Sequence, residues 1–349
     1  MMRPKMAIVS DVSSSGFDLI IDVRTPDEYE QDHLPGAVNY PVLDNEQRIL
    51  IGTLHKHSPF EARRLGAALI SRNVSNILEQ ELSTHQKQWK PLIYCWRGGL
   101  RSGSLAIVMA QVGWPVHQLT NGYKAYRQMV IDQLPLLIDK CTFRIVSAPT
   151  GSGKTHFLYA IQRAGGQIID LEGLACHRGS VLGRIPGQKQ PSQRLFESNL
   201  LEVLQKMDFS KDIFIECEGS KIGNICVPMP LRKRLLGGQC IYMNVAVEER
   251  VRFLCQEYSF FILDPELLIQ SLSQLSEVQS KETLLKWVRL AREGEFTDLV
   301  TQLVELHYDP SYHKSLRRHY PQVDSEDTVH VTAPSLSEGA LDTLALTLL

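Results

Sequence analysis

The sequence predicts an α/β protein with two successive domains. Short apolar segments of strand length alternate along the chain with longer segments of helical periodicity, a pattern typical of parallel sheets covered by helices. With 349 residues, the chain is long enough for two hydrophobic cores. A strand that runs directly into a glycine-rich loop, in "CTFRIVSAPTGSGKT", indicates that a second unit begins near residue 141. We therefore expect one domain over residues 1–137 and another over residues 138–349.

The first half of the chain contains strands and helices in alternation. "FDLIIDVR" predicts a buried strand that ends at Asp22, and "PLIYC" predicts another that ends at Cys95. "RSGSLAIVMAQVGW" has the length and period of a helix, which Gly113 would end. "PVHQLTNGYKAYRQMVIDQL" predicts a strand, a turn at Asn121 and a helix that stops before Pro135.

The second half continues this alternation. "FRIVS" predicts a strand, which the glycine-rich loop joins to the helix "THFLYAIQRAG". Apolar strands are also expected at the start of "IIDLEG" and "IFIECEG". Within the tail that follows Pro321, only "TVHVTA" predicts a strand.

Composition excludes several classes of protein. The chain is 43% apolar and 22% charged, with a formal net charge of −2, so contacts with nucleic acid must come from local basic patches. No apolar run is long enough to predict a signal peptide or a membrane span. The seven cysteines form no C-x-x-C pair, which argues against a disulfide framework and against a zinc site. We expect a cytoplasmic monomer without membrane contact.

Cys95 is followed by a loop that could bind an anion. A loop between the end of a strand and the start of a helix presents free backbone amides and the positive end of the helix dipole. Gly98 and Gly99 would allow these amides to converge, and Arg97 and Arg101 add positive charge. These features favour the thiolate and predict a nucleophile in an anion cradle. The alternative is a buried structural thiol.

Three segments of the first half resemble rhodanese domains. They are "DVRTPDEYEQDHLPGAVNYP", the cysteine loop "YCWRGGLRS" and "LTNGYKAYR", in the order found in that family. The resemblance implies a rhodanese-like fold with Cys95 as the catalytic residue. Sulfur-transferring rhodaneses commonly have C-x4-R, whereas the spacing from Cys95 to Arg101 is C-x5-R, as in rhodanese-related phosphatases. Loop length thus leaves chalcogen transfer and phosphate-ester hydrolysis open.

The second domain begins with a phosphate-binding loop. "APTGSGKT" matches the Walker A pattern except that Ala148 replaces the first glycine. Its position between a strand and a helix predicts a P-loop NTPase-like α/β domain, with Thr155 as a candidate Mg²⁺ ligand. The pattern does not say whether the ligand is a nucleotide or another diphosphate. The predicted phosphate-binding residues are Gly151, Ser152, Gly153, Lys154 and Thr155.

Acidic and basic residues near this loop are further candidates. Asp170, Glu172, Glu216 and Glu218 follow apolar strands, where a metal-bound water or a substrate would lie, and each could equally be a helix cap or a salt-bridge partner. Residues 176–196 contain no acidic residue, which suggests contact with a polyanion. The candidate polyanion-binding residues in this segment are Arg178, Arg184, Lys189 and Arg194.

The pairing of these two domains resembles the bacterial tRNA 2-selenouridine synthases. "DLEGLACHRGSVLG", "QPSQRLFES", "VPMPL" and "HYDPSYHKS" extend the resemblance over nearly the whole chain. It implies a transferase that geranylates the wobble 2-thiouridine of tRNA with geranyl diphosphate, and then replaces the S-geranyl group with selenium from selenophosphate. It also implies that Cys95 acts in selenium transfer, that the P-loop holds the diphosphate, and that no cofactor is tightly bound. The four candidate polyanion-binding residues are then predicted tRNA-binding residues. Ala148, Cys176 and Cys217 depart from the family pattern.

Two other hypotheses stay open at this point. A rhodanese-type phosphatase or sulfurtransferase fused to a nucleotide-binding domain would suit the C-x5-R loop. A non-catalytic regulator with the P-loop as a nucleotide switch is the third hypothesis, and the intact Cys95 argues against it.

Overall fold

The structure is a computed structural model that describes residues 6–10, 16–180 and 182–349. It contains two five-stranded sheets in which every strand pairs in parallel with its neighbours, so the predicted α/β class is confirmed. The chain divides into two compact units. Residues 1–134 and 191–202 form the first unit, and residues 135–190 and 203–349 form the second, so a short segment of the expected second domain packs with the first. No helix in the described part of the chain is long and apolar enough to cross a membrane.

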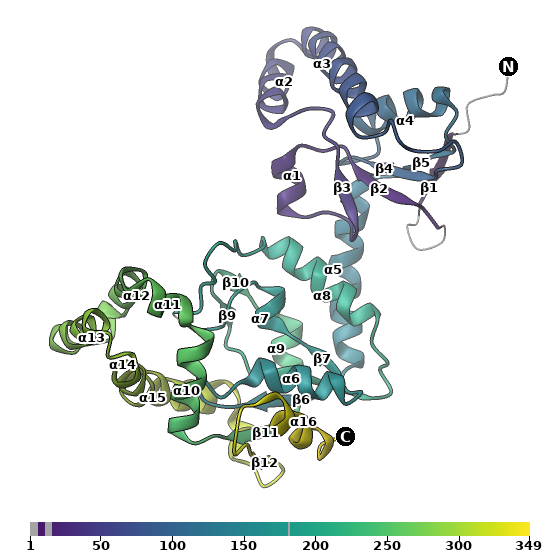
Figure 1. Ribbon diagram of the computed structural model, residues 1–349. Helices are drawn as coiled ribbons and strands as arrows, with labels where there is room; N and C mark the ends of the chain where they lie inside the picture. The colour runs from purple at the N-terminus through teal and green to yellow at the C-terminus, as the bar shows by residue number, and fades with distance from the viewer. Residues whose placement is uncertain (1–5, 11–15, 181) are drawn as a thin grey trace. The chain divides into compact units, whose positions relative to one another are not determined.

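The first unit is built on a sheet with the strand order β1-β5-β4-β2-β3 (Figure 1). Its strands are β1 (Met6–Val9), β2 (Leu19–Asp22), β3 (Ala37–Asn39), β4 (Pro91–Tyr94) and β5 (Val116–Leu119). Its helices are α1 (Pro26–Gln31), α2 (Asn45–His57), α3 (Pro59–Gln80), α4 (Leu100–Val112) and the start of α5 (Gly122–Lys140). β4 is buried at every position because it lies in the middle of the sheet. Gly113 ends α4 in the left-handed conformation, as the sequence predicts.

The predicted end of a helix before Pro135 is wrong. α5 continues through Pro135 to Lys140 and passes from the first unit to the second. A proline inside a helix costs about 3 kcal/mol because it lacks an N–H group and crowds the preceding turn. Leu134 and Ile138 on either side are both buried. Burial contributes roughly 2 kcal/mol for each such side chain, which is enough to offset the cost.

The second unit is built on a sheet with the strand order β12-β11-β6-β8-β7. Its strands are β6 (Thr142–Ser147), β7 (Gln167–Ile169), β8 (Asp212–Glu216), β11 (Gln239–Asn244) and β12 (Val329–Thr332), and β9 (Lys221–Ile222) and β10 (Ile225–Cys226) form a separate antiparallel pair. The strand predicted at "TVHVTA" is β12, and it pairs with β11. The helices next to the sheet are α6 (Lys154–Arg163), α7 (Leu171–Leu174), α8 (Gln193–Gln205, which begins in the first unit), α9 (Met229–Leu235) and α16 (Glu338–Leu346).

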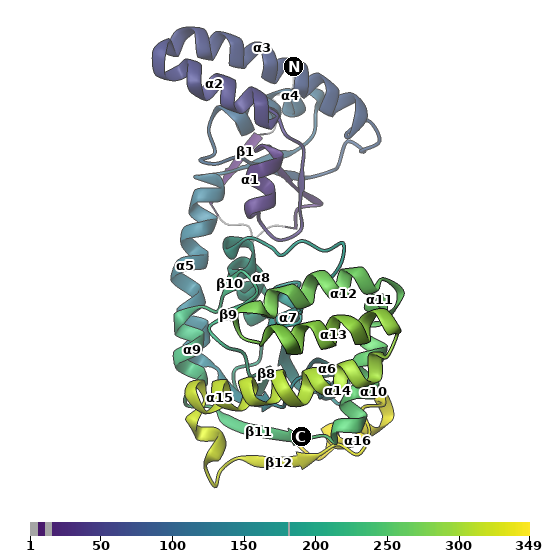
Figure 2. The ribbon, with the colours of Figure 1, turned by 90° about the vertical axis from the view of Figure 1, so that its left-hand side faces the viewer.

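A helical region is inserted between β11 and β12 of this sheet. Its α-helices gather side by side in both views (Figures 1 and 2). They are α10 (Val247–Glu257), α11 (Ser259–Leu263), α12 (Pro265–Leu272), α13 (Lys281–Glu293), α14 (Phe296–Leu303) and α15 (Asp309–His319). Shorter turns are the 3-10 segments η1 (Ser273–Glu277) and η3 (Pro321–Asp324) and the π-helical η2 (Val304–Tyr308). The region has its own apolar cluster around the fully buried Trp287.

Candidate active sites

Cys95 lies directly after β4, at the carboxyl end of the first sheet. Its side chain is only 3% exposed. The Ser102 hydroxyl, in the first turn of α4, donates a hydrogen bond to Cys95 Sγ at 3.2 Å. Gln118 Nε2 in turn donates to Ser102 Oγ at 2.8 Å. A chain of hydrogen bonds therefore runs from Gln118 of β5 through Ser102 of α4 to the Cys95 sulfur.

Two glycines allow the backbone around Cys95 to pack closely. Gly98 has φ +64°, and a Cβ atom there would lie 2.5 Å from the Leu119 carbonyl oxygen. Gly122 has φ +51°, and a Cβ atom there would lie 2.0 Å from the Cys95 carbonyl oxygen. The same carbonyl accepts a hydrogen bond from the Tyr123 amide at 2.9 Å. The turn before α5 therefore holds the cysteine loop in place.

The two arginines of the predicted anion cradle lie in different environments. Arg97 is exposed, as is Gly99 beside it. The Arg101 guanidinium forms a bidentate pair with Glu28, at 2.5 and 3.2 Å. Burial by itself would raise the pKa of Glu28, but the hydrogen bonds and charge of Arg101 outweigh burial and hold the pKa below its usual range. Arg101 is thus held by a carboxylate, Glu28, that was not among the predicted site residues.

The phosphate-binding loop joins β6 to α6 in the second unit. Gly151 and Gly153 have φ +81° and +68°, so both glycines of the Walker A pattern use the left-handed region. Ala148 is buried, and Asn121 and Cys176 are the only non-glycine residues with positive φ in the described part of the chain. Alanine at position 148 therefore causes no backbone strain, which explains how the chain tolerates this departure from the Walker A pattern.

A buried arginine from a distant helix fixes this loop. Arg250 of α10 is 2% exposed and donates to the Thr150 carbonyl oxygen through Nε at 2.9 Å and through Nη2 at 2.7 Å. Asp309 accepts two further hydrogen bonds from Arg250, at 2.6 and 3.0 Å. The helical region thereby holds the phosphate loop through a charge-assisted network.

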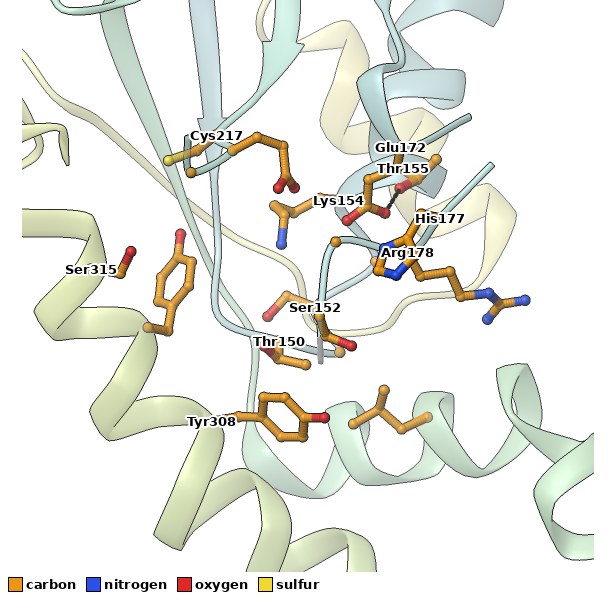
Figure 3. Close-up of a pocket in the computed structure, with 18 of the residues that line it drawn as sticks. Thr150, Ser152, Lys154, Thr155, Glu172, His177, Arg178, Cys217, Tyr308 and Ser315 are labelled. Atoms are coloured by element: carbon orange, nitrogen blue, oxygen red, sulfur yellow. Dashed lines mark hydrogen bonds between the residues drawn. The ribbon is translucent and has the colours of Figure 1, made fainter. Parts of the chain in front are cut away.

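The loop opens into a cavity of about 730 Å³. In Figure 3, Lys154 and the Thr155–Glu172 pair lie on one side of this pocket, while Thr150 and Tyr308 lie on another. Thr155 Oγ1 donates to Glu172 Oε2 at 3.3 Å, and Lys154 Nζ lies 5.7 Å from the centre of the Tyr312 ring. All five predicted phosphate-binding residues thus line this pocket, together with the Glu172 carboxylate.

The four predicted acidic residues have different environments. Asp170 caps α7, accepting from the Gly173 amide at 2.7 Å, and also accepts from the Tyr159 hydroxyl. Glu216 is fully buried and accepts a hydrogen bond from the Glu172 amide at 2.7 Å. Burial and neighbouring carboxylates raise the pKa of Glu216 well above its usual range. Glu172 and Glu218 line the pocket, as Asp170 does. Burial raises the pKa of Glu172 and of Glu218 against the attraction of Lys154.

The four predicted tRNA-binding residues do not form one group. Arg178 lines the pocket, where its guanidinium pairs with Glu257 at 3.1 Å and lies 4.7 Å from the centre of the Tyr258 ring. Arg184 and Lys189 are exposed on the loop that follows. Arg194 belongs to the segment that packs with the first unit. Of these four, only Arg178 contacts the phosphate pocket.

Several side chains of the two sites were not among the residues predicted from the sequence. Ser102 follows Arg101 directly, so its place on the first turn of α4 was a usable signal. Gln118 comes from a neighbouring strand, and Arg250 lies about 100 positions after Thr150. Tyr308 and Tyr312 lie in "HYDPSYHKS", one of the segments that carry the family resemblance, and both line the pocket.

Comparison with known proteins identifies both units. Residues 8–129 match the rhodanese-like domain model, and residues 141–285 match the model of the tRNA 2-selenouridine synthase AAA domain. A tRNA 2-selenouridine synthase from Nitrosomonas europaea is 34% identical over 68% of this chain and 63% of its own length. Its counterpart from Aeromonas salmonicida is 32% identical over 73% of this chain and 69% of its own length. The alignment thus spans about two thirds of these relatives, and the chain belongs to the tRNA 2-selenouridine synthase family.

Proposed function

We propose that this protein converts 2-thiouridine at the wobble position of tRNA into 2-selenouridine in two steps. Geranyl diphosphate first alkylates the sulfur, and selenium from selenophosphate then replaces the S-geranyl group. The observation that carries this proposal is the presence, in one chain of this family, of a cysteine anion loop and a separate phosphate pocket. The enzyme would be a transferase with tRNA as its macromolecular partner.

The phosphate pocket suits the alkylation step. The thiouridine sulfur attacks C1 of the geranyl group, the C1–O bond breaks, the diphosphate leaves with the bonding electrons, and the proton on N3 of the base passes to solvent. The amides of Gly151 and Gly153 and the Lys154 ammonium would stabilise the negative charge that grows on the diphosphate. This step needs no hydrolysis of a nucleotide, which suits a P-loop used only for binding.

The pocket also has oxygen ligands that suit Mg²⁺. Thr155 Oγ1 and the Glu172 carboxylate lie together beside the phosphate loop, and Mg²⁺ prefers one or two such ligands together with phosphate oxygens. When bound, the ion would neutralise charge on the diphosphate. The chain's own residues still orient the prenyl diphosphate through the loop amides and Lys154.

The cysteine loop suits the second step. Alkylation makes C2 of the base more electrophilic and turns the sulfur into a leaving group. The selenium of selenophosphate would add to C2, the C2–S bond would break, and geranyl thiol would depart with a proton from solvent. Water would then cleave the Se–P bond and release phosphate. Cys95 accepts a hydrogen bond from Ser102 and follows directly on β4, at the start of the anion-binding loop. We assign Cys95 as the nucleophile of the selenium-transfer step. The same loop amides would bind the phosphate part of selenophosphate.

Product analysis tests the proposal. Purified protein is incubated with 2-thiouridine-containing tRNA, geranyl diphosphate and selenophosphate, and the nucleosides are identified by mass spectrometry. We expect 2-selenouridine with both co-substrates and S-geranyl-2-thiouridine when selenophosphate is omitted. Cys226→Ala, at an exposed cysteine outside both sites, is the control and should give wild-type products. Formation of 2-selenouridine at the full rate without any prenyl diphosphate would contradict the proposed order of steps.

The C-x5-R spacing supports a second candidate function. A loop of this length has room for a tetrahedral phosphate, so the first unit could act as a phosphatase on its own. Release of phosphate from an aryl phosphate by wild-type protein, and its loss in Cys95→Ala, would favour this alternative.

A further inference from the structure

A small apolar chamber adjoins the phosphate pocket on the side of the helical region. Its volume is about 60 Å³. Thr150, Ser180, Leu254, Tyr258 and Tyr308 line both cavities and so form their common wall. The remaining wall of the chamber is aliphatic and aromatic and comes largely from α11, α12 and α14, with Phe261, Leu268, Phe296 and Leu299 among its residues. A ligand whose head binds at the phosphate loop could thus extend an apolar tail between the helices.

Tyr308 lies in the common wall and has its polar group occupied by the protein. Its hydroxyl is hydrogen-bonded to the Ser180 side chain and to the backbone of Leu182, and burial raises its pKa. The Tyr308 ring therefore presents an apolar surface to the chamber, and its hydroxyl does not need a hydrogen bond from a ligand. Tyr308 also ends the π-helical turn η2, and such turns are frequent at functional sites because they change which side chains a helix presents.

The size of the chamber matches one isoprene unit. A water-sized sphere needs about 10–15 Å³ of this volume, so 60 Å³ holds on the order of five methylene-sized groups. An isoprene unit has five carbons. We propose that the chamber binds the terminal isoprene unit of a prenyl diphosphate, while the first unit and its reacting carbon stay in the phosphate pocket near Lys154.

This inference rests on the proposed function and adds chain-length selection to it. A dimethylallyl chain, with one unit, would leave the chamber empty, and a farnesyl chain, with three units, would exceed it. A geranyl chain fills it. The transfer of five carbons from water to an apolar cavity corresponds to a preference for geranyl over dimethylallyl diphosphate of at least about a hundredfold in affinity.

Filling the chamber from its wall tests the inference. Leu268→Phe adds volume inside the chamber, whereas Leu284→Phe makes the same change in the same apolar cluster at a residue that lines neither cavity. Affinities for dimethylallyl, geranyl and farnesyl diphosphate are measured by calorimetry on the full chain, with inorganic diphosphate as a probe of the phosphate loop alone. Leu268→Phe should weaken geranyl diphosphate binding about tenfold or more and leave inorganic diphosphate unchanged. Leu284→Phe should change neither.

The opposite change provides a second variant. Phe296→Ala enlarges the chamber and should raise the affinity for farnesyl relative to geranyl diphosphate. If both chamber variants keep the wild-type order of affinities for dimethylallyl, geranyl and farnesyl diphosphate, the inference is wrong. A higher melting temperature of Leu268→Phe would then identify the chamber as a packing defect. In that outcome the proposed function stands. If wild-type protein binds prenyl diphosphates no more tightly than inorganic diphosphate and transfers no prenyl group, the proposed function fails with it.

Discussion

The cysteine loop and the phosphate loop start from the same local geometry and become different sites. Each follows a central strand of a parallel sheet, β4 or β6, and each leads into a helix, which is where such sheets bind ligands. Cys95 is enclosed by its own loop and by the turn before α5, and it is almost fully buried. The phosphate loop instead opens into a large pocket, because α10 and α15 supply a distant wall. The neighbouring segments, rather than the loop itself, decide whether a site is closed or open.

The largest expected effect on stability comes from adding a side chain at Gly122, where the backbone packs against the cysteine loop. Gly122→Ala would place a Cβ atom 2.0 Å from the Cys95 carbonyl at a positive φ. It should destabilise the first unit by about 2–4 kcal/mol and abolish selenium transfer. Gly113→Ala, which also has positive φ but no atom within 4 Å, should cost only about 1 kcal/mol. Denaturant unfolding compares the two variants, and equal losses would show that contact with Cys95 is irrelevant.

A smaller effect is expected from the hydroxyl that hydrogen-bonds to the thiol. Ser102→Ala removes the donor to Cys95 Sγ and should slow alkylation of Cys95 by iodoacetamide about tenfold at neutral pH. Ser104→Ala is the matched control, since that hydroxyl donates to the Leu100 carbonyl on the same helix. Mass spectrometry of the Cys95 peptide follows the reaction. A rate unchanged by Ser102→Ala would mean that the hydrogen bond does not activate the thiol.

A smaller effect than that of Ser102→Ala is expected on tRNA affinity when the positive charge of Arg184 is removed. Arg184 is exposed, whereas Arg64 in the first unit is paired with Glu61. If Arg184 neutralises a tRNA phosphate, Arg184→Ala should weaken binding a few-fold and make the slope of log affinity against log salt shallower by about 0.7–0.9. Arg64→Ala should leave the slope unchanged. Identical salt slopes for wild type and Arg184→Ala would place the RNA contact elsewhere.

The smallest effect concerns the pair that holds Arg101. Because Arg101 holds the pKa of folded Glu28 below its unfolded value, the pair stabilises the protein above the unfolded pKa and loses this contribution as pH falls through the folded pKa. Glu28→Gln should cost about 1 kcal/mol at pH 7 and progressively less in acid. Glu61→Gln, at the exposed pair with Arg64, should cost close to nothing. A Glu28→Gln penalty that does not change with pH would exclude the charge as its source.

Local features of the sequence predicted much of the fold and the loops at both sites. Strands such as β2 and β4 are short apolar runs. The two glycine-rich loops contain glycines with positive φ, a conformation that other residue types rarely adopt. The pair of Arg250 with the Thr150 carbonyl and the donor from Gln118 join positions far apart in the chain. The path of α5 through Pro135 depends on the burial of Ile138, which helix propensity does not report. Tertiary packing therefore decided what local patterns could not.

Separation of the two steps by single substitutions tests the central claim most directly. Lys154→Ala and Cys95→Ala are each supplied with tRNA that already carries S-geranyl-2-thiouridine, together with selenophosphate, and formation of 2-selenouridine is measured. The two-site account predicts that Lys154→Ala works at close to the wild-type rate, because the diphosphate step has been bypassed, while Cys95→Ala is inactive. On unmodified 2-thiouridine tRNA with geranyl diphosphate, Cys95→Ala should accumulate the S-geranyl product and Lys154→Ala should form none. Equal loss of selenium transfer in both variants on pre-geranylated tRNA would contradict the account.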